Sequence, residues 1–481
     1  MPSTENLANL LADHPFAEER DLLCTIDRTV TVGEAKALVA QLATQLTDAG
    51  VQPGEGVAVR LPSDPDLVVA MLAIWSAGAV FVPLNDRSPE SEVRHVLDTV
   101  RPAAVLEESG LRRLPSPLRH EPDIAFVTWT SGTTGPPKAI LQSHSGYLEL
   151  LDRVLKPLRG DGGARKEGAR EPTPNLVPVS VALNAGIYNV CFGLRAGAAV
   201  VLMPRFATGD FAELVHRYQV RSTVLPPAAM VMLTDDPAVT DLSPLRFVRS
   251  ITAPLSPLAA RRFMERFGVT VLNSYGQAEV GEVVGWTAAD AREHPEKLGA
   301  AGRPLPGVDI RVVDEHDVDV APDTVGQLLV RPPRMAAGYA GGASLSDRID
   351  TAGFVRTGDH ARVDAEGFVW IEGRTSDLIN RGGNKVFPEQ VEEVLRLAPG
   401  VQDAAVVAWP DDRLGEVPVA VVVGDATDEE LAALCRTELA PYKVPVAFRR
   451  VETLPRSEVG KLLRRQLVDD LRAKTPDAPT A

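Results

Sequence analysis

The segment TSGTTGPPK, residues 130–138, combines glycines, hydroxyls and a lysine directly after the apolar run 124–129. Gly132 and Gly135 permit positive φ angles, so successive N–H groups can surround phosphate oxygens while hydroxyl side chains add donors. A Walker loop needs Gly-Lys-Ser/Thr at a helix start, whereas two prolines precede the lysine here, which indicates another kind of phosphate loop. An ordinary Ser/Gly turn would need neither the strand before it nor the lysine after it. The residues predicted to bind phosphates are Thr130, Ser131, Gly132, Thr133, Thr134, Gly135 and Lys138.

Two further segments contain residue types suited to a nucleotide. In NSYGQAE, residues 273–279, Tyr275 can stack on a purine, and Glu279 offers a hard oxygen ligand for Mg2+ beside a triphosphate. In RTGD, residues 356–359, Asp359 can accept hydrogen bonds from both hydroxyls of a ribose. The alternatives are a core tyrosine, a surface glutamate and a turn-forming aspartate.

Lys461 is the chemically active candidate near the carboxyl end of the chain, where it follows a glycine in PRSEVGKLLRR. An ammonium on a flexible stem can reach into a site between domains. There it would neutralise charge that develops as a carboxylate oxygen attacks the α-phosphorus of ATP. The alternative is a solvated terminal lysine.

The elements that must position these residues alternate in a β-α-β rhythm from residue 21 to about residue 302. Short apolar runs such as GVAVRLP and AVFVPL alternate with segments of helical period, at residues 66–77, 90–100 and 211–218. This rhythm predicts parallel sheets in a large, doubly wound α/β body.

The pattern changes twice in the second half of the chain. After residues 303–307, strands separated by turns, such as DIRVVDE and GFVWIEG, predict a small β-rich subdomain. Beyond residue 374, helical segments at 388–397 and 428–439 and the strands DAAVVAW and VPVAVVVG predict a separate small α+β domain.

Composition narrows the class of protein. The chain has 481 residues, a formal net charge of -15 and dispersed basic residues, which disfavours nucleic acid as a partner. It has three widely spaced cysteines, which fits a reducing cytoplasm. The first residues lack a signal-peptide core and no apolar stretch approaches about 18 residues, so we expect a soluble cytoplasmic protein without a membrane partner.

The motifs together resemble those of the adenylate-forming superfamily, which comprises acyl-CoA synthetases, adenylation domains and luciferases. TSGTTGPPK resembles its phosphate loop, NSYGQAE its aromatic-Gly-x-Thr-Glu motif and RTGD its ribose motif. The segments that resemble the early helix-strand signature, the hinge and crossover region, and the catalytic-lysine motif are LAIWSAGAVFVPLN (72–85), GRTSDLINRGGNKVFPEQVEE (373–393) and PRSEVGKLLRR (455–465). These matches fall in family order along nearly the whole chain.

The resemblance implies an adenylation (AMP-binding) domain over residues 1–375 and a mobile carboxy-terminal domain over residues 376–481. Lys461 and Lys138 would be the catalytic lysines, and Arg374 would contact ribose and phosphate or else form a salt bridge at the domain interface. The further nucleotide-binding residues implied are Ala253, Pro254, Asn273, Tyr275, Gly276, Gln277 and Asp359. ATP and Mg2+ are then expected, with coenzyme A or a carrier-protein phosphopantetheine as acceptor.

Two departures from the family pattern affect the motifs themselves. Ala278 replaces the usual threonine and removes a hydroxyl that would donate to the α-phosphate. Ser376 stands at the hinge position, where Asp or Lys is usual, and this leaves rotation of the domain plausible but changes the residue that would serve it. The acceptor and hinge region implied by the resemblance contains Ser376, Gly382, Gly383 and Lys385.

Other departures concern the substrate. No acidic residue occurs between Asn175 and Gly193, which disfavours an α-amino acid, because amino-acid-activating domains place an aspartate there. Ile251 and Thr252 stand where the family often has two glycines, so they should fill the acyl pocket and favour a short or unusual acid. The alternatives are that the alignment with the family is shifted by one residue or that Ile251 faces the core. The predicted pocket residues are Leu183, Asn184, Gly186, Ile251 and Thr252.

The sequence therefore predicts an ATP-dependent enzyme that converts a small carboxylic acid to its acyl adenylate with release of pyrophosphate, and then transfers the acyl group to a thiol, by default that of coenzyme A. Three alternatives remain open. One is a stand-alone adenylation enzyme that loads an acyl carrier protein, and another activates a non-carboxylate acid such as nitrite. The third is a degenerate homologue that only binds nucleotide.

Overall fold

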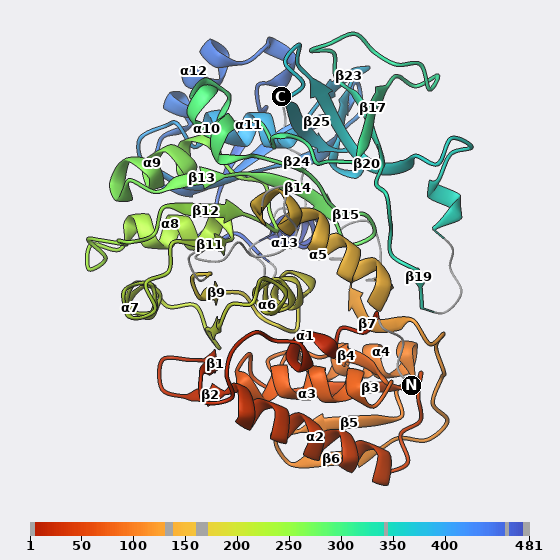
Figure 1. Ribbon diagram of the computed structural model, residues 1–481. Coiled ribbons are helices and arrows are strands. Elements are labelled where there is room, and N and C mark those ends of the chain that lie inside the picture. Colours follow the sequence, from red (N-terminus) through yellow and green to blue (C-terminus); the bar gives the residue numbers. More distant parts are fainter. Residues whose placement is uncertain (1–4, 130–137, 160–171, 341–344, 457–460, 475–481) are drawn as a thin grey trace.

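The computed structural model describes residues 5–129, 138–159, 172–340, 345–456 and 461–474, with the side chains of 156–159 and 474 left out. Figure 1 shows the chain from red at the amino end, through a yellow and green middle, to a blue carboxy-terminal part at the opposite side of the molecule. The predicted phosphate-loop residues Thr130, Ser131, Gly132, Thr133, Thr134 and Gly135 lie outside the described residues.

One seven-stranded sheet contains the strand that leads into the phosphate loop. Its strands, in sheet order, are β19 (Gly338–Tyr339), β8 (Ala139–Ser143), β7 (Ile124–Trp129), β4 (Val80–Pro83), β3 (Gly56–Arg60), β5 (Ala104–Glu107) and β6 (Gly110–Arg113). The central strands pair in parallel, with Val57 opposite both Phe81 and Ala104. The antiparallel pairing of β7 and β8 places Trp129 opposite Ala139, on either side of the predicted phosphate-loop segment.

A second seven-stranded sheet is built largely from parallel strands. Its strands, in sheet order, are β13 (Thr270–Leu272), β12 (Phe247–Ser250), β11 (Ser222–Leu225), β9 (Asn175–Val177), β10 (Val200–Leu202), β1 (Asp21–Cys24) and β2 (Thr29–Thr31). Its outer face is covered by α7 (Thr208–Arg217), α8 (Pro227–Asp235) and α9 (Pro257–Phe267), whose apolar residues share a core with Leu176, Val201 and Val248.

The inner faces of both sheets share a single core with five helices, α1 (Asn9–Ala12), α2 (Val32–Asp48), α3 (Pro65–Ser76), α5 (His144–Arg159) and α6 (Asn184–Ala196). Helix α3 is apolar on all sides because it is enclosed, and each residue from Leu67 to Trp75 is at most 5% exposed. The Asp64 carboxylate caps its first turn and Pro65 begins the helix. On the outer face of the first sheet, α4 (Glu90–Val100) packs through Val93. The predicted doubly wound body is confirmed.

The β-rich region that follows consists of two small antiparallel sheets. One contains β14 (Ser274–Gln277), β15 (Gly281–Gly285) and β16 (Arg303–Pro304), and the other β17 (Asp309–Val313), β18 (Gly326–Arg331), β20 (Val355–Val363) and β21 (Val369–Arg374). The strands predicted after residue 307 form the second sheet, whereas β14 and β15 of the first lie within the region expected to follow the β-α-β rhythm. In the chain, α10 (Ala288–Glu293) and a short 3-10 turn at Pro295–Lys297 lie between β15 and β16, and a second 3-10 turn at Ser346–Arg348 precedes β20.

The carboxy-terminal part has its own sheet and its own core. It comprises β22 (Ile379–Arg381), β23 (Asn384–Val386), β24 (Val401–Asp411), β25 (Gly415–Gly424) and β26 (Ala447–Arg450), with α11 (Pro388–Leu395), α12 (Asp428–Glu438), α13 (Arg464–Lys474) and a 3-10 turn at Pro441–Lys443. A 3-10 turn at Thr375–Asp377 connects it to β21. The expected boundary at residue 375 falls in this turn and stays a prediction.

Candidate active site

A cavity of about 2810 Å³ lies where the body, the β-rich region and the carboxy-terminal part meet. Its charged lining residues include Lys138, Glu279, Asp359 and Lys461, which come from distant parts of the sequence. The fold thus brings together side chains that the sequence singled out separately for phosphate, metal, ribose and acyl transfer.

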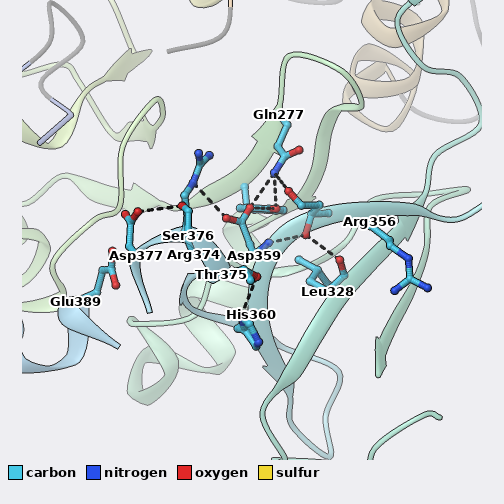
Figure 2. Close-up of polar contacts among 12 residues, drawn as sticks. Gln277, Leu328, Arg356, Asp359, His360, Arg374, Thr375, Ser376, Asp377 and Glu389 are labelled. Atoms are coloured by element: carbon cyan, nitrogen blue, oxygen red, sulfur yellow. Dashed lines mark hydrogen bonds and ion pairs between the residues drawn. The ribbon is translucent and has the colours of Figure 1, made fainter. Parts of the chain in front are cut away.

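Asp359 is held at the edge of this cavity by β20, and its residue is only 4% exposed. Figure 2 shows its carboxylate between Gln277 and Arg374. Oδ2 accepts hydrogen bonds from the Tyr275 hydroxyl at 2.5 Å and the Gln277 side-chain amide at 2.8 Å. Oδ1 forms an ion pair with Arg374 at 3.3 Å, since these two residues are paired across β20 and β21. Asp359 is therefore a rigidly oriented carboxylate with Oδ1 the less crowded oxygen.

Tyr275 contributes its hydroxyl to this network. Burial raises the pKa of Tyr275, and the neighbouring Asp359 carboxylate raises it further, so the phenol stays protonated and donates. The predicted stacking of its ring on a purine stays a prediction. Gly276, the next residue, runs so close to β15 that a Cβ there would lie 2.3 Å from the Gly281 carbonyl oxygen, which explains the glycine.

Glu279, the predicted metal ligand, is buried and oriented by two donors. Its Oε1 accepts from the Tyr339 hydroxyl at 3.1 Å and from Arg348 Nη1 at 2.9 Å. Arg348 also reaches the Gln277 side-chain oxygen at 3.1 Å, which joins the metal and ribose residues into one network. Within the described part of the chain no cluster of three or more metal-ligating side chains occurs. The Glu279 carboxylate lines the cavity and fits Mg2+, which usually binds one or two carboxylates and completes its shell with phosphates and water.

The two predicted catalytic lysines enter the cavity from different parts of the molecule. Lys138 precedes β8 and places its ammonium 5.2 Å from the centre of the Tyr339 ring. Lys461 comes from the carboxy-terminal part and lies within electrostatic reach of Arg374, Asp359 and Glu279. Burial lowers the pKa of Lys461, Arg374 lowers it further, and the two carboxylates oppose the shift.

The remaining nucleotide residues implied by the resemblance lie around the same cavity. Ala253, Pro254 and Asn273 line it, and Asn273 is fixed by a hydrogen bond from its amide to the Ala300 carbonyl at 3.2 Å. Ala278, where the family has threonine, also lines the cavity, and its carbonyl accepts from Gln142 at 2.8 Å.

Four of the five predicted substrate residues line the cavity: Leu183, Asn184, Ile251 and Thr252. Thr252 has φ +75°, a left-handed conformation that favours glycine, so the backbone keeps the conformation that glycine would adopt without strain. Gly186 serves packing, because a Cβ there would lie 2.1 Å from the Ser180 carbonyl oxygen. The selection for a small acid by Ile251 stays a prediction.

The expected hinge and acceptor residues lie next to the cavity or beyond it. Ser376 lines the cavity and donates a hydrogen bond to Asp377 at 2.9 Å. Gly382 and Gly383 form the two-residue turn between β22 and β23, with φ angles of +57° and +89°, as a tight hairpin requires. Lys385, on β23, is exposed. Burial lowers the pKa of His360, and the positive charge of Lys385 lowers it further.

Sequence reasoning missed several residues of the site. Arg348 is an isolated arginine in a 3-10 turn, and Tyr339 lies on a two-residue strand, so neither belongs to a recognisable pattern. Arg464 follows Lys461 by three residues and binds Glu389 at 2.9 Å and Glu392, both on α11. Its position inside the quoted catalytic-lysine motif was the available signal.

Comparisons with known proteins agree with this geometry. The family model of the AMP-binding enzyme matches residues 12–115 and 108–340, and the model of the AMP-binding enzyme C-terminal domain matches residues 390–461. The chain is 31% identical to feruloyl-CoA synthase of Amycolatopsis sp over 468 residues, covering 90% of this chain and 92% of that one. It is 28% identical to 2-succinylbenzoate–CoA ligase of Bacillus cereus (strain ATCC 10987 / NRS 248), covering 96% and 98%.

Among solved structures, o-succinylbenzoate CoA synthetase from Bacillus subtilis in complex with its acyl-adenylate intermediate superposes with a TM-score of 0.84. The sequence identity is 26%, and the match covers 96% of this chain and 97% of that one. The chain belongs to the AMP-binding enzyme family, so the predicted membership in the adenylate-forming superfamily and the predicted fold class are confirmed.

Proposed function

We propose that this protein is an AMP-forming ligase of the acyl-CoA synthetase type, which activates a carboxylic acid with ATP and transfers the acyl group to coenzyme A. The observation that carries the proposal is the position of Lys461. This lysine comes from the carboxy-terminal part and yet lies in one cavity with Lys138, Glu279 and Asp359 of the body. A cation inserted there can act only on a substrate held between the two parts of the molecule.

In the first half-reaction a carboxylate oxygen of the acid attacks the α-phosphorus of ATP. A new bond forms between that oxygen and phosphorus, the bond to the β-phosphate oxygen breaks, and pyrophosphate leaves with the electron pair. Lys461 would hold the attacking carboxylate against the α-phosphate and offset the charge that gathers there. Its lowered pKa reflects a partly desolvated ammonium, whose field is stronger than that of a solvated one.

The chain's other residues bind and orient the nucleotide. Asp359 would accept hydrogen bonds from the ribose hydroxyls, mainly through Oδ1, while Tyr275 and Gln277 keep the carboxylate fixed. Glu279 would hold Mg2+ together with phosphate oxygens, and the bound Mg2+ would neutralise phosphate charge. Lys138 would supply a positive charge to the phosphates from the other side of the cavity.

In the second half-reaction the sulfur of the acceptor forms a bond to the acyl carbon, the bond from that carbon to the phosphate oxygen breaks, AMP leaves with the electron pair, and the thiol proton passes to solvent. We propose that the carboxy-terminal part, residues 376–481, rotates near Ser376 between the half-reactions and withdraws Lys461. Coenzyme A is the proposed acceptor, and a carrier-protein phosphopantetheine is the alternative within the same chemistry.

The proposed substrate is a small acid without an α-ammonium group. Leu183, Ile251 and Thr252 line the cavity. Residues 175–193, which include Leu183, contain no acidic side chain that could pair with an ammonium group. We further propose that the protein acts in the cytoplasm. No helix in the described part of the chain has the length and apolar character needed to cross a bilayer.

Release of pyrophosphate tests the proposal directly. The protein is incubated with MgATP and a panel of aliphatic, aromatic and inorganic acids, with and without coenzyme A, and pyrophosphate, AMP and thioester are measured. We expect acid-dependent pyrophosphate in both series and thioester only with coenzyme A. Pyrophosphate with nitrite alone would favour activation of a non-carboxylate acid, and thioester formed on an added carrier protein but not on coenzyme A would favour the carrier-loading alternative. Absence of pyrophosphate with every acid would favour a nucleotide-binding homologue without activity.

A further inference from the structure

The acyl end of the cavity contains a cluster of charged and polar side chains that the half-reactions described above do not use. Its members are Arg153 on α5, Tyr188 on α6, Arg249 on β12 and Glu282 on β15, and all four line the cavity. An ordinary acyl pocket is apolar, because each buried polar group that lacks a partner costs free energy. These four residues therefore need an explanation.

Two of the four members have polar atoms that are enclosed and unpaired. The hydroxyl of Tyr188 and the Nε of Arg153 are both buried and without a hydrogen-bond partner among the residues that the structure describes. Burial lowers the pKa of Arg153 and raises that of Tyr188, so both groups are held in a desolvated setting. Native proteins satisfy nearly all buried polar groups, which makes a pair of orphaned donors at one place an unusual arrangement.

The other two members neutralise each other. Arg249 donates to the Glu282 carboxylate, and their side chains are 27% and 15% exposed. The two acids that precede Arg153 on its helix are engaged elsewhere, Glu149 by Arg334 at 2.5 Å and Asp152 by Arg195 at 2.8 Å. The cluster thus carries one positive charge in excess, on Arg153.

The four side chains lie close enough to act on one another electrostatically. Glu282 raises the pKa of Tyr188, whereas Arg249 and Arg153 lower it. The Tyr188 ring is held in place by stacking on Phe192, with ring centres 6.0 Å apart. The cluster is therefore a preformed site with one cation, one hydroxyl donor and one net positive charge.

We infer that the substrate carries a second carboxylate, at the end distant from the one that is adenylated, and that Arg153 and Tyr188 bind it. A guanidinium presents a planar fork that matches a carboxylate in two parallel hydrogen bonds, and the Tyr188 hydroxyl can donate a third. One bound carboxylate would cancel the single excess charge and satisfy both orphaned donors. This inference rests on the proposed function and specifies its substrate class as a dicarboxylic acid.

The test compares acids of matched length in the pyrophosphate-release assay: a series of α,ω-dicarboxylic acids, their monomethyl esters and the corresponding monocarboxylic acids. The wild-type protein should prefer at least one diacid over its ester and monoacid by about 30-fold or more in kcat/KM, the scale of a buried charge pair. Equal use of monoacids and diacids would overturn the dicarboxylate inference and leave the ligase function standing. No pyrophosphate with any acid would refute the ligase function itself.

Two variants locate the second carboxylate. R153M should lower kcat/KM for the preferred diacid by about 30-fold or more and leave the monoacid equal or improved. Y188F keeps the ring and removes only the hydroxyl, so it should cost about 2- to 10-fold, for the diacid alone. The control is R195Q, which removes a similar arginine that joins α6 to α5 through Asp152 at 2.8 Å, away from the cavity lining.

A merely structural role for Arg153 would give a different pattern. In that case R153M would lower activity with monoacids and diacids alike and would lower the thermal midpoint. A selective loss of the diacid with an unchanged midpoint supports the assignment. If R153M folds poorly, the selectivity of Y188F decides, and equal loss for both acid classes in Y188F would overturn the inference.

Discussion

Asp359 offers a quantitative test of the nucleotide site, because its hydrogen bonds are known before the nucleotide arrives. The perturbations are D359A, which removes the carboxylate, and D359N, which keeps its shape but replaces one acceptor with a donor. In D359N the new amide would face either Arg374 or the donors of Tyr275 and Gln277, so it cannot restore the network.

The expected magnitude follows from the number and kind of contacts. A hydrogen bond to a charged acceptor contributes roughly 1.5–3 kcal/mol, so loss of the ribose contacts should weaken ATP binding by about 10- to 150-fold. Loss of the Tyr275 and Arg374 partners should also lower the free energy of unfolding, because both groups remain partly buried. The two effects must therefore be measured separately.

Isothermal calorimetry with three ligands separates them. The ligands are ATP, its 2′,3′-dideoxy analogue and inorganic tripolyphosphate, and the control variant is D309A, which breaks an exposed ion pair with Arg331 in the same small sheet. Wild type should bind the dideoxy analogue more weakly than ATP, whereas D359A should bind ATP and the analogue equally weakly. Tripolyphosphate should bind wild type and D359A alike.

Two results would refute the assignment. If D359A weakened ATP and tripolyphosphate by the same factor, the carboxylate would be organising the cavity as a whole and not the ribose. If replacing ATP with the dideoxy analogue weakened binding by the same factor in D359A as in wild type, another group would bind the ribose hydroxyls.

Three further predictions address catalysis, the pocket and stability. K461A should slow adenylate formation by roughly 100- to 1000-fold and leave thioester formation from a synthetic adenylate largely intact, which half-reaction assays measure; equal loss in both would refute the role. I251A should raise the catalytic efficiency for longer or aryl acids, by up to about 0.8 kcal/mol per newly buried methylene, and lower it for the native acid. Pyrophosphate release across a series of acids of increasing length measures this change. If the order of preference is unaltered, Ile251 does not line the pocket. Burial lowers the pKa of His144 to about 4. The histidine is therefore neutral in the folded protein at pH values where the unfolded chain already binds a proton. Its contribution to the free energy of unfolding is complete above pH 6.5, and about 3 kcal/mol is lost as the pH falls toward 4. H144N keeps an acceptor for the Leu7 N–H and should reduce the loss of unfolding free energy between pH 6.5 and 4, as measured by denaturant titrations. The control H316N changes an exposed histidine and should leave this pH dependence unaltered. The same pH dependence in wild type and H144N would contradict the lowered pKa of His144.

The elements of the fold could be predicted where sequence pattern and local chemistry coincide. The helix expected at residues 90–100 is α4 with the same bounds, since its amphipathic period begins after a proline and ends where Arg101 turns left-handed. The helix expected at 211–218 instead begins at Thr208, because its first turn is polar and gives no apolar period. The apolar period of a sequence cannot locate a helix boundary that lies in a polar turn.

The candidate site could be predicted in part for a similar reason. Lys138, Glu279, Asp359 and Lys461 each stand in a short motif, and the structure gathers them in one cavity. Their partners could not be found in this way. Arg348 meets Glu279 only because the 3-10 turn at Ser346–Arg348 brings a residue from a distant part of the sequence beside it, and such a contact leaves no local pattern.

The contacts around Lys461 bear on how the proposed rotation of residues 376–481 would withdraw this lysine from the cavity. Arg464, three residues after Lys461, is bound to Glu389 and Glu392 of α11 and to Asp377 at 3.3 Å. The side chain of Arg464 is only 16% exposed, and separating it from the buried Glu392 carboxylate and the partly buried Glu389 carboxylate would cost several kcal/mol. Lys461 therefore cannot leave the cavity by fraying of its own segment while this network holds. Polar side-chain contacts that cross from β21 to α11, such as Gln390 with Glu372 at 2.5 Å, join fewer groups and lie beside the turn at residues 375–377. A rotation about that turn can break them and leave the ion network intact, so the lysine would be withdrawn together with the domain that anchors it.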